Sequence, residues 1–202
     1  MSESEQGSPR ETMAALGIIQ AGDPILRQVT RRFELPDEAE DARRVIAELT
    51  TAIERIEKVH TFAKGVGIAA PQIGINRSAA LVRTPDREAI TLLNPRVIEG
   101  NAGDEHDEQY EGCLSFFAVR GLVPRSLTIH VEHQDLDGRH RISVFERGVA
   151  RLVAHELDHL VGVLYTDRMR PGVEPIPVSE YTGSGQRWHY KADRSSWPMA
   201  PP

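Results

Sequence analysis

Residues 147–162 read RGVARLVAHELDHLVG, and the apolar positions in this stretch recur at the spacing of a largely buried helix. His155 and His159 are four residues apart and therefore share one helix face, so both imidazoles can reach one ion. Glu156 lies beside the first histidine and can handle a proton of water bound there. This HExxH arrangement makes metal-assisted hydrolysis the first hypothesis. The alternative, an exposed amphipathic helix with two surface histidines, conflicts with the apolar run around them.

Length and composition limit the classes of protein. The chain has 202 residues, 40% of them hydrophobic, which is enough for one compact domain. A net charge of -6 gives no sign of a nucleic-acid partner. No apolar run approaches the roughly 20 residues that span a bilayer, so no membrane partner is expected. The lone Cys113 and the lack of a signal-like N-terminus favour a cytoplasmic location.

The hydrophobic pattern predicts an α+β fold. An amphipathic helix is expected from about 40 to 60, and the central HExxH helix from about 147 to 161, with Gly162 ending it. Short apolar or alternating runs predict antiparallel strands packed around that central helix, and these runs are 79–82, 90–93, 127–131 and 142–144, with a hairpin turn at 135–138. The predicted organisation is a disordered tail over 1–13, a catalytic domain over 14–170 and a loosely ordered tail over 171–202.

Two further segments carry candidate chemistry. A catalytic metal needs a third protein ligand, and Cys113 in EGCLS is the leading candidate because it is the only thiol. A small buried core cysteine and a nucleophile with a histidine base are the alternatives, although the latter leaves Glu156 without a task. In 65-GVGIAAPQIG-74, Gln72 sits in an apolar stretch and needs partners, or donates to a substrate oxygen. Alone, this segment reads as a tight turn between packed elements.

Together, GVGIAAPQ, EGCLS and HELDHLVG, in this order and at these separations, resemble the three signature motifs of the peptide deformylases. The resemblance continues in GVLYTDR at 162–168, GDPILR at 22–27 and LVPR at 122–125, and covers about residues 15–170. It departs from the family where Phe116-Phe117-Ala118 follows the cysteine motif and where Ala154 precedes His155.

The resemblance implies specific roles. Cys113, His155 and His159 would bind one divalent ion, Fe²⁺ natively, with Zn²⁺ or Ni²⁺ able to replace it. Metal-bound hydroxide would attack the formyl carbon, with Glu156 as general base and acid. Gln72 and the N–H of Leu114 would donate to the developing oxyanion. The substrate would be the N-formyl-methionyl end of a nascent polypeptide, near the ribosome exit, and formate would be released.

Substrate binding can be sketched from the same segments. An extended peptide could pair with the strand Gly65-Val66-Gly67 by edge addition, and Leu152 with the cysteine loop could line the methionine pocket. We also hypothesise that Asp158 pairs with Arg125 and orients the helix against the cysteine loop; the alternative is an exposed aspartate.

Other functions remain open at this stage. A zinc peptidase would need a downstream third ligand, for which Glu174 and Glu180 in the Pro-rich tail are the available residues. A non-enzymatic binding protein on the same scaffold is disfavoured by the intact Glu156 and Gln72. A deformylase for a specialised formylated metabolite, or a resistance copy, is a third alternative.

Overall fold

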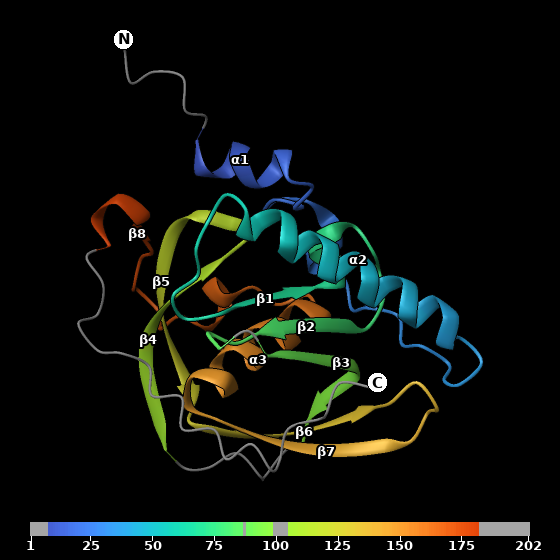
Figure 1. The fold of residues 1–202 in the computed structure, drawn as a ribbon. Helices are drawn as coiled ribbons and strands as arrows, with labels where there is room; N and C mark the ends of the chain where they lie inside the picture. The colour runs from blue at the N-terminus through green and yellow to red at the C-terminus, as the bar shows by residue number, and fades with distance from the viewer. Residues whose placement is uncertain (1–7, 87, 99–104, 182–202) are drawn as a thin grey trace.

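The computed structural model describes residues 8–86, 88–98 and 105–181. Antiparallel strands form two sheets, and the longer helices pack against the larger one (Figure 1). Among the described residues, no helix has the length and apolarity that crossing a bilayer requires. The helices are α1 (Pro9–Ala15), α2 (Ala39–Glu57) and α3 (Arg147–Leu160). The strands are β1 (Val66–Ala69), β2 (Ala79–Arg83), β3 (Ala89–Val97), β4 (His106–Cys113), β5 (Phe116–Ser126), β6 (Thr128–Gln134), β7 (His140–Glu146) and β8 (Ile176–Pro177).

The five-stranded sheet has the order β1-β2-β3-β6-β7, and every neighbouring pair is antiparallel. Alternate residues of its first strands point to opposite sides. Ile68 and Leu81 join the core under α2, whereas Val82 and Leu92 join the core under α3. Both faces of this part of the sheet are therefore covered, which explains why the sequence reads there as short, nearly continuous apolar runs.

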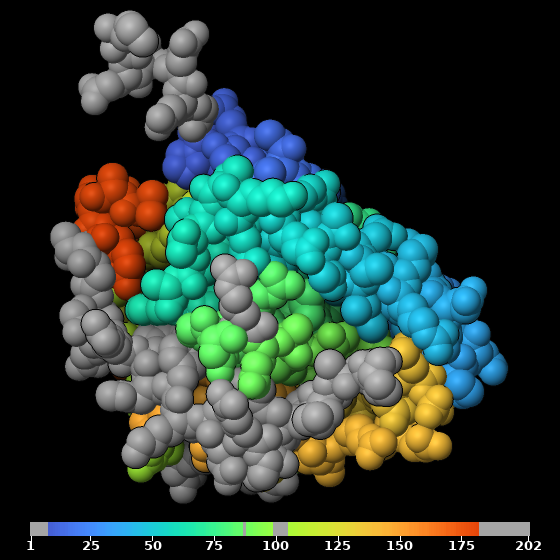
Figure 2. Space-filling view, in the orientation of Figure 1, coloured from blue at the N-terminus to red at the C-terminus, as the bar shows by residue number. Residues whose placement is uncertain are grey.

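The smaller sheet has the order β4-β5-β8 and carries the cysteine loop. β4 and β5 form an antiparallel hairpin in which Cys113 opposes Phe116, so Leu114 and Ser115 make the tight connection. In the space-filling view, α2 runs along one side of the visible face, and α1 lies above it at the top of the described part (Figure 2).

The predicted class, mixed helix and antiparallel sheet, is confirmed. Parts of both expected tail segments have regular secondary structure among the described residues. Residues 9–13 of the expected disordered tail lie in α1, where Ser8 and Glu11 form a capping box and Met13 is buried. The start of the expected loose tail, 171–181, contains β8, whose Ile176 pairs with Arg120 of β5. Positions 1–7 and 182–202 lie outside the described residues.

Candidate metal and active site

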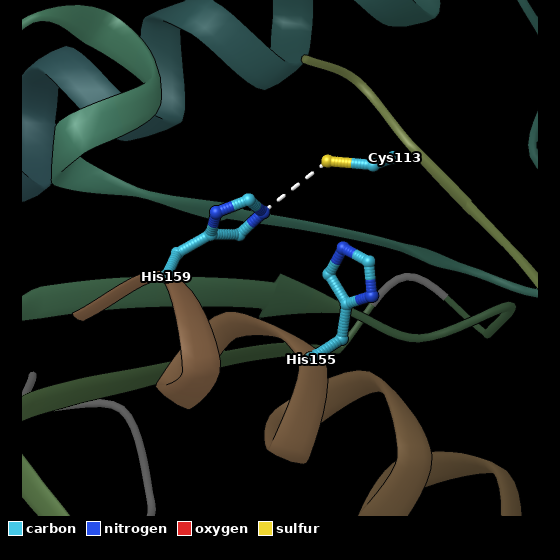
Figure 3. Close-up of side chains that lie close together, drawn as sticks. All are labelled: Cys113, His155 and His159. Atoms are coloured by element: carbon cyan, nitrogen blue, oxygen red, sulfur yellow. Dashed lines mark hydrogen bonds between the residues drawn. The ribbon is translucent and has the colours of Figure 1, made fainter. Parts of the chain in front are cut away.

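One cysteine and two histidines converge at the centre of the structure. His155 and His159 project from consecutive turns of α3, and Cys113 approaches from the end of β4 (Figure 3). Their ligand atoms all lie within 4.8 Å of one another, and Cys113 Sγ is 3.2 Å from His159 Nε2. All three residues are buried. These segments, over 40 residues apart in sequence, thus form one candidate metal centre.

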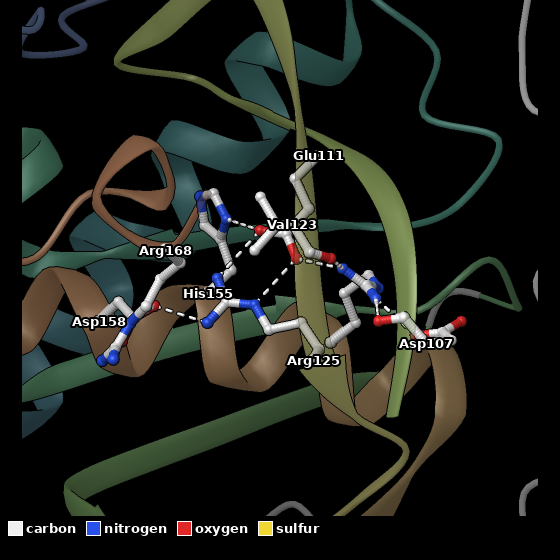
Figure 4. A network of polar contacts seen from close by, with 8 residues as sticks. Asp107, Glu111, Val123, Arg125, His155, Asp158 and Arg168 are labelled. Carbon is white, nitrogen blue, oxygen red and sulfur yellow. Dashed lines mark hydrogen bonds and ion pairs between the residues drawn. The ribbon is translucent and has the colours of Figure 1, made fainter. Parts of the chain in front are cut away.

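A buried carboxylate orients the first histidine. Glu111 Oε2 lies 3.0 Å from His155 Nδ1, which leaves Nε2 as the ring nitrogen available to a metal (Figure 4). Glu111 also accepts from Arg125 Nε at 2.9 Å and from Arg151 Nη1 at 2.6 Å. Although burial opposes its ionisation, the Arg125 charge and the His155 hydrogen bond hold the pKa of Glu111 well below its usual range.

The hypothesised pairing of Asp158 with Arg125 is present. Arg125 Nη1 donates to Asp158 Oδ2 at 2.6 Å, and both side chains are buried. Arg168 Nη2 donates to the other carboxylate oxygen at 2.7 Å (Figure 4). Arg125 therefore connects α3 to β4 through two carboxylates, one of which also holds His155.

Gln72 is fixed so that its amide NH₂ faces the cysteine loop. Its Oε1 accepts from the Ala69 N–H at 2.8 Å, and its Nε2 lies 3.5 Å from Cys113 Sγ and 3.3 Å from Ser115 Oγ. The side chain is only 1% exposed. Leu114, the next residue after Cys113, is buried and lines the same cavity. The structure thus brings together both residues that the sequence nominated as oxyanion donors.

Glu156 is buried against the edge strand. A Cβ placed on Gly67 of β1 would lie 2.3 Å from Glu156 Oε1, so the missing side chain at Gly67 makes room for this carboxylate. Within the described part of the chain, Glu156 Oε2 has no hydrogen-bond partner. Burial raises the pKa of Glu156 to about 7, which suits a group that exchanges protons near neutral pH.

The two histidines differ in their affinity for protons. Burial lowers the pKa of His159 well below its usual value, and the His155 charge lowers it further. Burial also acts to lower the pKa of His155, but its contacts with Cys113 and Glu111 outweigh this effect and raise that pKa well above its usual value. The cluster therefore holds a positive charge most readily at His155.

A cavity of about 290 Å³ opens onto the cluster. It is lined by all four residues nominated for substrate binding, namely Gly65, Val66, Gly67 and Leu152. Phe117 also lines it, whereas Ala154 is absent from the lining and packs beside the core between α3 and the larger sheet. Of the two departures from the family motifs, the segment after the cysteine is therefore the one that reaches the cavity.

The donor set fits a divalent transition metal. A thiolate and two imidazoles are ligands that Fe²⁺, Zn²⁺ and Ni²⁺ accept, and three protein ligands leave a position open for reaction. Glu156 Oε2 is a buried polar atom without a partner among the described residues, as expected beside a site built for a group beyond the protein itself. Glu174 and Glu180, the ligands that a zinc peptidase would need, are exposed and outside the cluster.

Sequence reasoning missed three residues of the site. Glu111 and Arg151 lie inside the segments EGCLS and RGVARLVAHELDHLVG, but no role was predicted for either of them. For Arg151 a signal existed, because a charged residue inside an apolar helix indicates a buried partner, here Glu111. Tyr181, in the expected loose tail, lines the cavity and packs on Tyr110 at a ring-centroid distance of 5.4 Å. No local pattern distinguishes Tyr181 from the rest of the tail.

Comparisons with known proteins agree with this geometry. The family description "Polypeptide deformylase" matches residues 15–174. A peptide deformylase of Desulforudis audaxviator is 35% identical over 160 residues, covering 77% of this chain and 94% of the relative. One of Dictyoglomus thermophilum is 41% identical over 151 residues, covering 75% and 90%.

Solved structures give the same result. A peptide deformylase of Thermotoga maritima has a TM-score of 0.66 at 31% identity, covering 76% of this chain and 97% of that one. A class I type b peptide deformylase of Acinetobacter baumannii, solved with Met-Ala-Ser bound, has a TM-score of 0.63 at 31% identity, covering 75% and 96%.

Proposed function

The chain belongs to the peptide deformylase family, which removes N-terminal formyl groups from polypeptides, and on this premise we propose how its own residues carry out that reaction. The observation that carries the proposal is the cluster of Cys113, His155 and His159 beside a cavity that Cys113, His155 and Glu156 line. These three residues would hold one divalent ion, for which the family resemblance favours Fe²⁺ and the donor set also admits Zn²⁺ or Ni²⁺.

The ion would supply Lewis acidity that brings the pKa of a water toward neutrality and polarises the formyl group. Glu156 then takes a proton from the attacking water through its unpartnered Oε2 and returns it to the amine that leaves. Its raised pKa supports this exchange, because the carboxyl can hold and release a proton near pH 7.

Two donors would stabilise the formyl oxygen as it gains charge. Gln72 Nε2 is held toward the cysteine loop, and the Leu114 N–H lies in the turn directly after Cys113. Preorganised donors of this kind each lower a barrier by roughly 3–4 kcal/mol.

The peptide would lie along β1. This strand pairs only with β2 in the described sheet, so its other edge can accept an extended chain. Val66 and Gly67 are in β1, Gly65 directly precedes it, and Leu152 offers an apolar surface for the methionine side chain. The proposed substrates are N-formyl-methionyl nascent chains leaving the ribosome in the cytoplasm, and this last part stays a prediction.

The test joins metal analysis to product release. The protein is purified anaerobically, its metal is measured, and formate is assayed with formyl-Met-Ala-Ser. Glu156→Gln should keep the metal and lose activity, whereas Cys113→Ala should lose both. Metal retained by Cys113→Ala would favour the peptidase alternative. Loaded protein that releases no formate would favour a binding protein.

A further inference from the structure

Arg120 places a positive charge in the wall of the cavity. It belongs to β5, is half-buried, and lines the same cavity as Cys113 and His155. Its Nη1 donates to the carbonyl oxygens of Phe117 at 2.9 Å and Val119 at 2.8 Å. Its guanidinium also lies 5.1 Å from the centroid of the Phe117 ring. These contacts fix the side chain in place, but none of them carries a negative charge.

The fully buried arginines among the described residues have carboxylate partners. Arg77 pairs with Glu38 and Asp41, Arg125 with Glu111 and Asp158, and Arg151 with Glu111 and Asp107. Over the described ranges, Arg120 makes no ion pair. A partly desolvated cation without a carboxylate partner is unfavourable by itself, and burial accordingly lowers the pKa of Arg120, although Tyr165, Tyr181 and Cys113 act to raise it. An acidic group entering the cavity would supply the carboxylate that the fully buried arginines already have.

The backbone on both sides of Arg120 sets its position. A Cβ on Gly112 would lie 2.6 Å from Arg120 Cζ, so the guanidinium rests directly on the backbone of the residue before Cys113. On the other side, β8 pairs Ile176 with Arg120. Arg120 is therefore held next to the candidate metal centre. The absence of a side chain at Gly112 leaves the space that the guanidinium occupies.

The residues around Arg120 form the outer part of the cavity. His60, Lys64, Tyr110 and Tyr181 are half-buried and line it together with Arg120, whereas the metal cluster, Gln72 and Glu156 are buried. The carboxylates that line the cavity are Glu111, which is neutralised by two arginines, and Glu156, which faces β1. Among the described residues, the cations of this outer part are Lys64 and Arg120, and an acidic group beside Arg120 is stabilised by its charge.

We propose that Arg120 binds a carboxylate carried by the formylated peptide beyond its first residue, and so determines a preference for acidic peptides. This inference rests on the proposed function. With the formyl end at the metal cluster, an extended peptide presents its second and third residues to the half-buried outer part of the cavity. Arg offers a planar fork of donors that matches a carboxylate. The carboxylate comes either from an aspartate or glutamate side chain or from the C-terminus of a short peptide.

The experiment compares matched substrates. We would measure kcat/KM for the amides of formyl-Met-Asp-Ala, formyl-Met-Asn-Ala, formyl-Met-Ala-Asp and formyl-Met-Ala-Asn, and for formyl-Met-Ala-Ser as free acid and as amide. The Asp/Asn ratios report a side-chain carboxylate, and the acid/amide ratio reports a C-terminal one. At least one ratio should be about ten in the native protein, the contribution of one modest hydrogen bond to a charged group. Arg120→Gln should bring that ratio close to one.

Two control variants separate charge from structure. Arg120→Lys keeps the charge and should keep part of the preference, whereas Arg96→Gln removes an arginine that pairs with Glu132 on the sheet surface and should keep all of it. Each ratio is internal to one variant, so a general loss of turnover cancels. Ratios near one in the native protein, or a ratio that persists in Arg120→Gln, would overturn the proposal.

A binding measurement distinguishes this proposal from the proposed function. Titration calorimetry of the metal-loaded protein with the unformylated Asp and Asn peptides needs no turnover. Formate release without a charge preference would disprove the role of Arg120 alone. Preferential binding of acidic peptides that is lost in Arg120→Gln, without any formate release, would support Arg120 and disprove the proposed reaction.

Discussion

Glu111 and His155 are joined by a buried hydrogen bond of 3.0 Å between Glu111 Oε2 and His155 Nδ1. Glu111 lies only two residues before Cys113 in the same strand. The strand that delivers the cysteine therefore also delivers the carboxylate that orients a histidine of the same cluster. Arg125 and Arg151 keep that carboxylate ionised in the interior. The candidate metal centre is thus built by β4 as much as by α3.

Glu111→Gln should weaken metal binding. Loss of the carboxylate leaves His155 without its anionic partner, and changes of this kind reduce metal affinity by about 10- to 100-fold. It also leaves two buried arginines under-compensated, at a cost of about 3–5 kcal/mol in the free energy of unfolding. Metal content after dialysis and urea denaturation measure the two effects.

The matched control for that variant is Glu132→Gln. Glu132 likewise accepts from a histidine, His140, at 2.8 Å and pairs with Arg96, but it lies on the exposed side of β6. It should change stability by about 1 kcal/mol or less and leave the metal in place. Equal metal loss in both variants would show that Glu111 has no specific role in holding His155.

Asp158→Asn should lower metal retention. Asp158 holds Arg125, which in turn holds Glu111, so the substitution loosens the connection between α3 and the cysteine strand. We expect a loss of about 3 kcal/mol in the free energy of unfolding. Arg168→Gln removes only the half-exposed partner of Asp158 and should cost about 1 kcal/mol or less. Unchanged metal content in Asp158→Asn would show that the Asp158–Arg125 pair does not help to hold the metal ligands in place.

Gly67→Ala should reduce catalysis without removing the metal. The new Cβ would fall 2.3 Å from Glu156 Oε1, so the carboxylate must move from its place at β1. A misplaced general base typically costs at least about 100-fold in rate. Formate release and metal content are measured together in the single variants and in the double variant with Glu156→Gln. If displacement of Glu156 is the cause, Gly67→Ala adds no further loss once Glu156 is Gln. A full additional loss in the double variant would assign Gly67 another role.

The sequence predicted the parts of this site that depend on local spacing. The histidines four residues apart, the apolar face of α3 and the alternation in β6 each follow from the geometry of one element. The roles of Cys113 and Gln72 could be predicted only from the order of three separate motifs along the sequence. The Ser8–Glu11 capping box is also local, but the polar composition around it concealed the start of α1.

The remaining features depend on contacts between distant segments. In the sequence, Arg151 is a single charged residue within an apolar helix. Its partners, Glu111 and Asp107, lie in β4 and are identified only by the structure. The ordering of 176–181 requires the edge of β5 and the ring of Tyr110, neither of which is predictable from a Pro-rich stretch. The pairing of Asp158 with Arg125 was hypothesised from the sequence, whereas these other pairings between distant residues have no local pattern and are visible only in the folded structure.

Metal binding should weaken as the pH falls, beginning above pH 6.5, the ordinary pKa of histidine. The pKa of His155 is raised by Cys113 and Glu111, and a proton on this ring must leave before the nitrogen can bind a metal. The pKa of His159 is lowered by burial, so this ring does not compete through its own protonation. Affinity is measured against a chelator of known pH dependence, at steps between about pH 5.5 and 8.5. In Glu111→Gln, one cause of the raised His155 pKa is absent, so affinity should be lower overall but its decline should begin at a lower pH. Affinity that does not vary with pH in the native protein, or a decline at the same pH in both proteins, would contradict this assignment of the competing proton to His155.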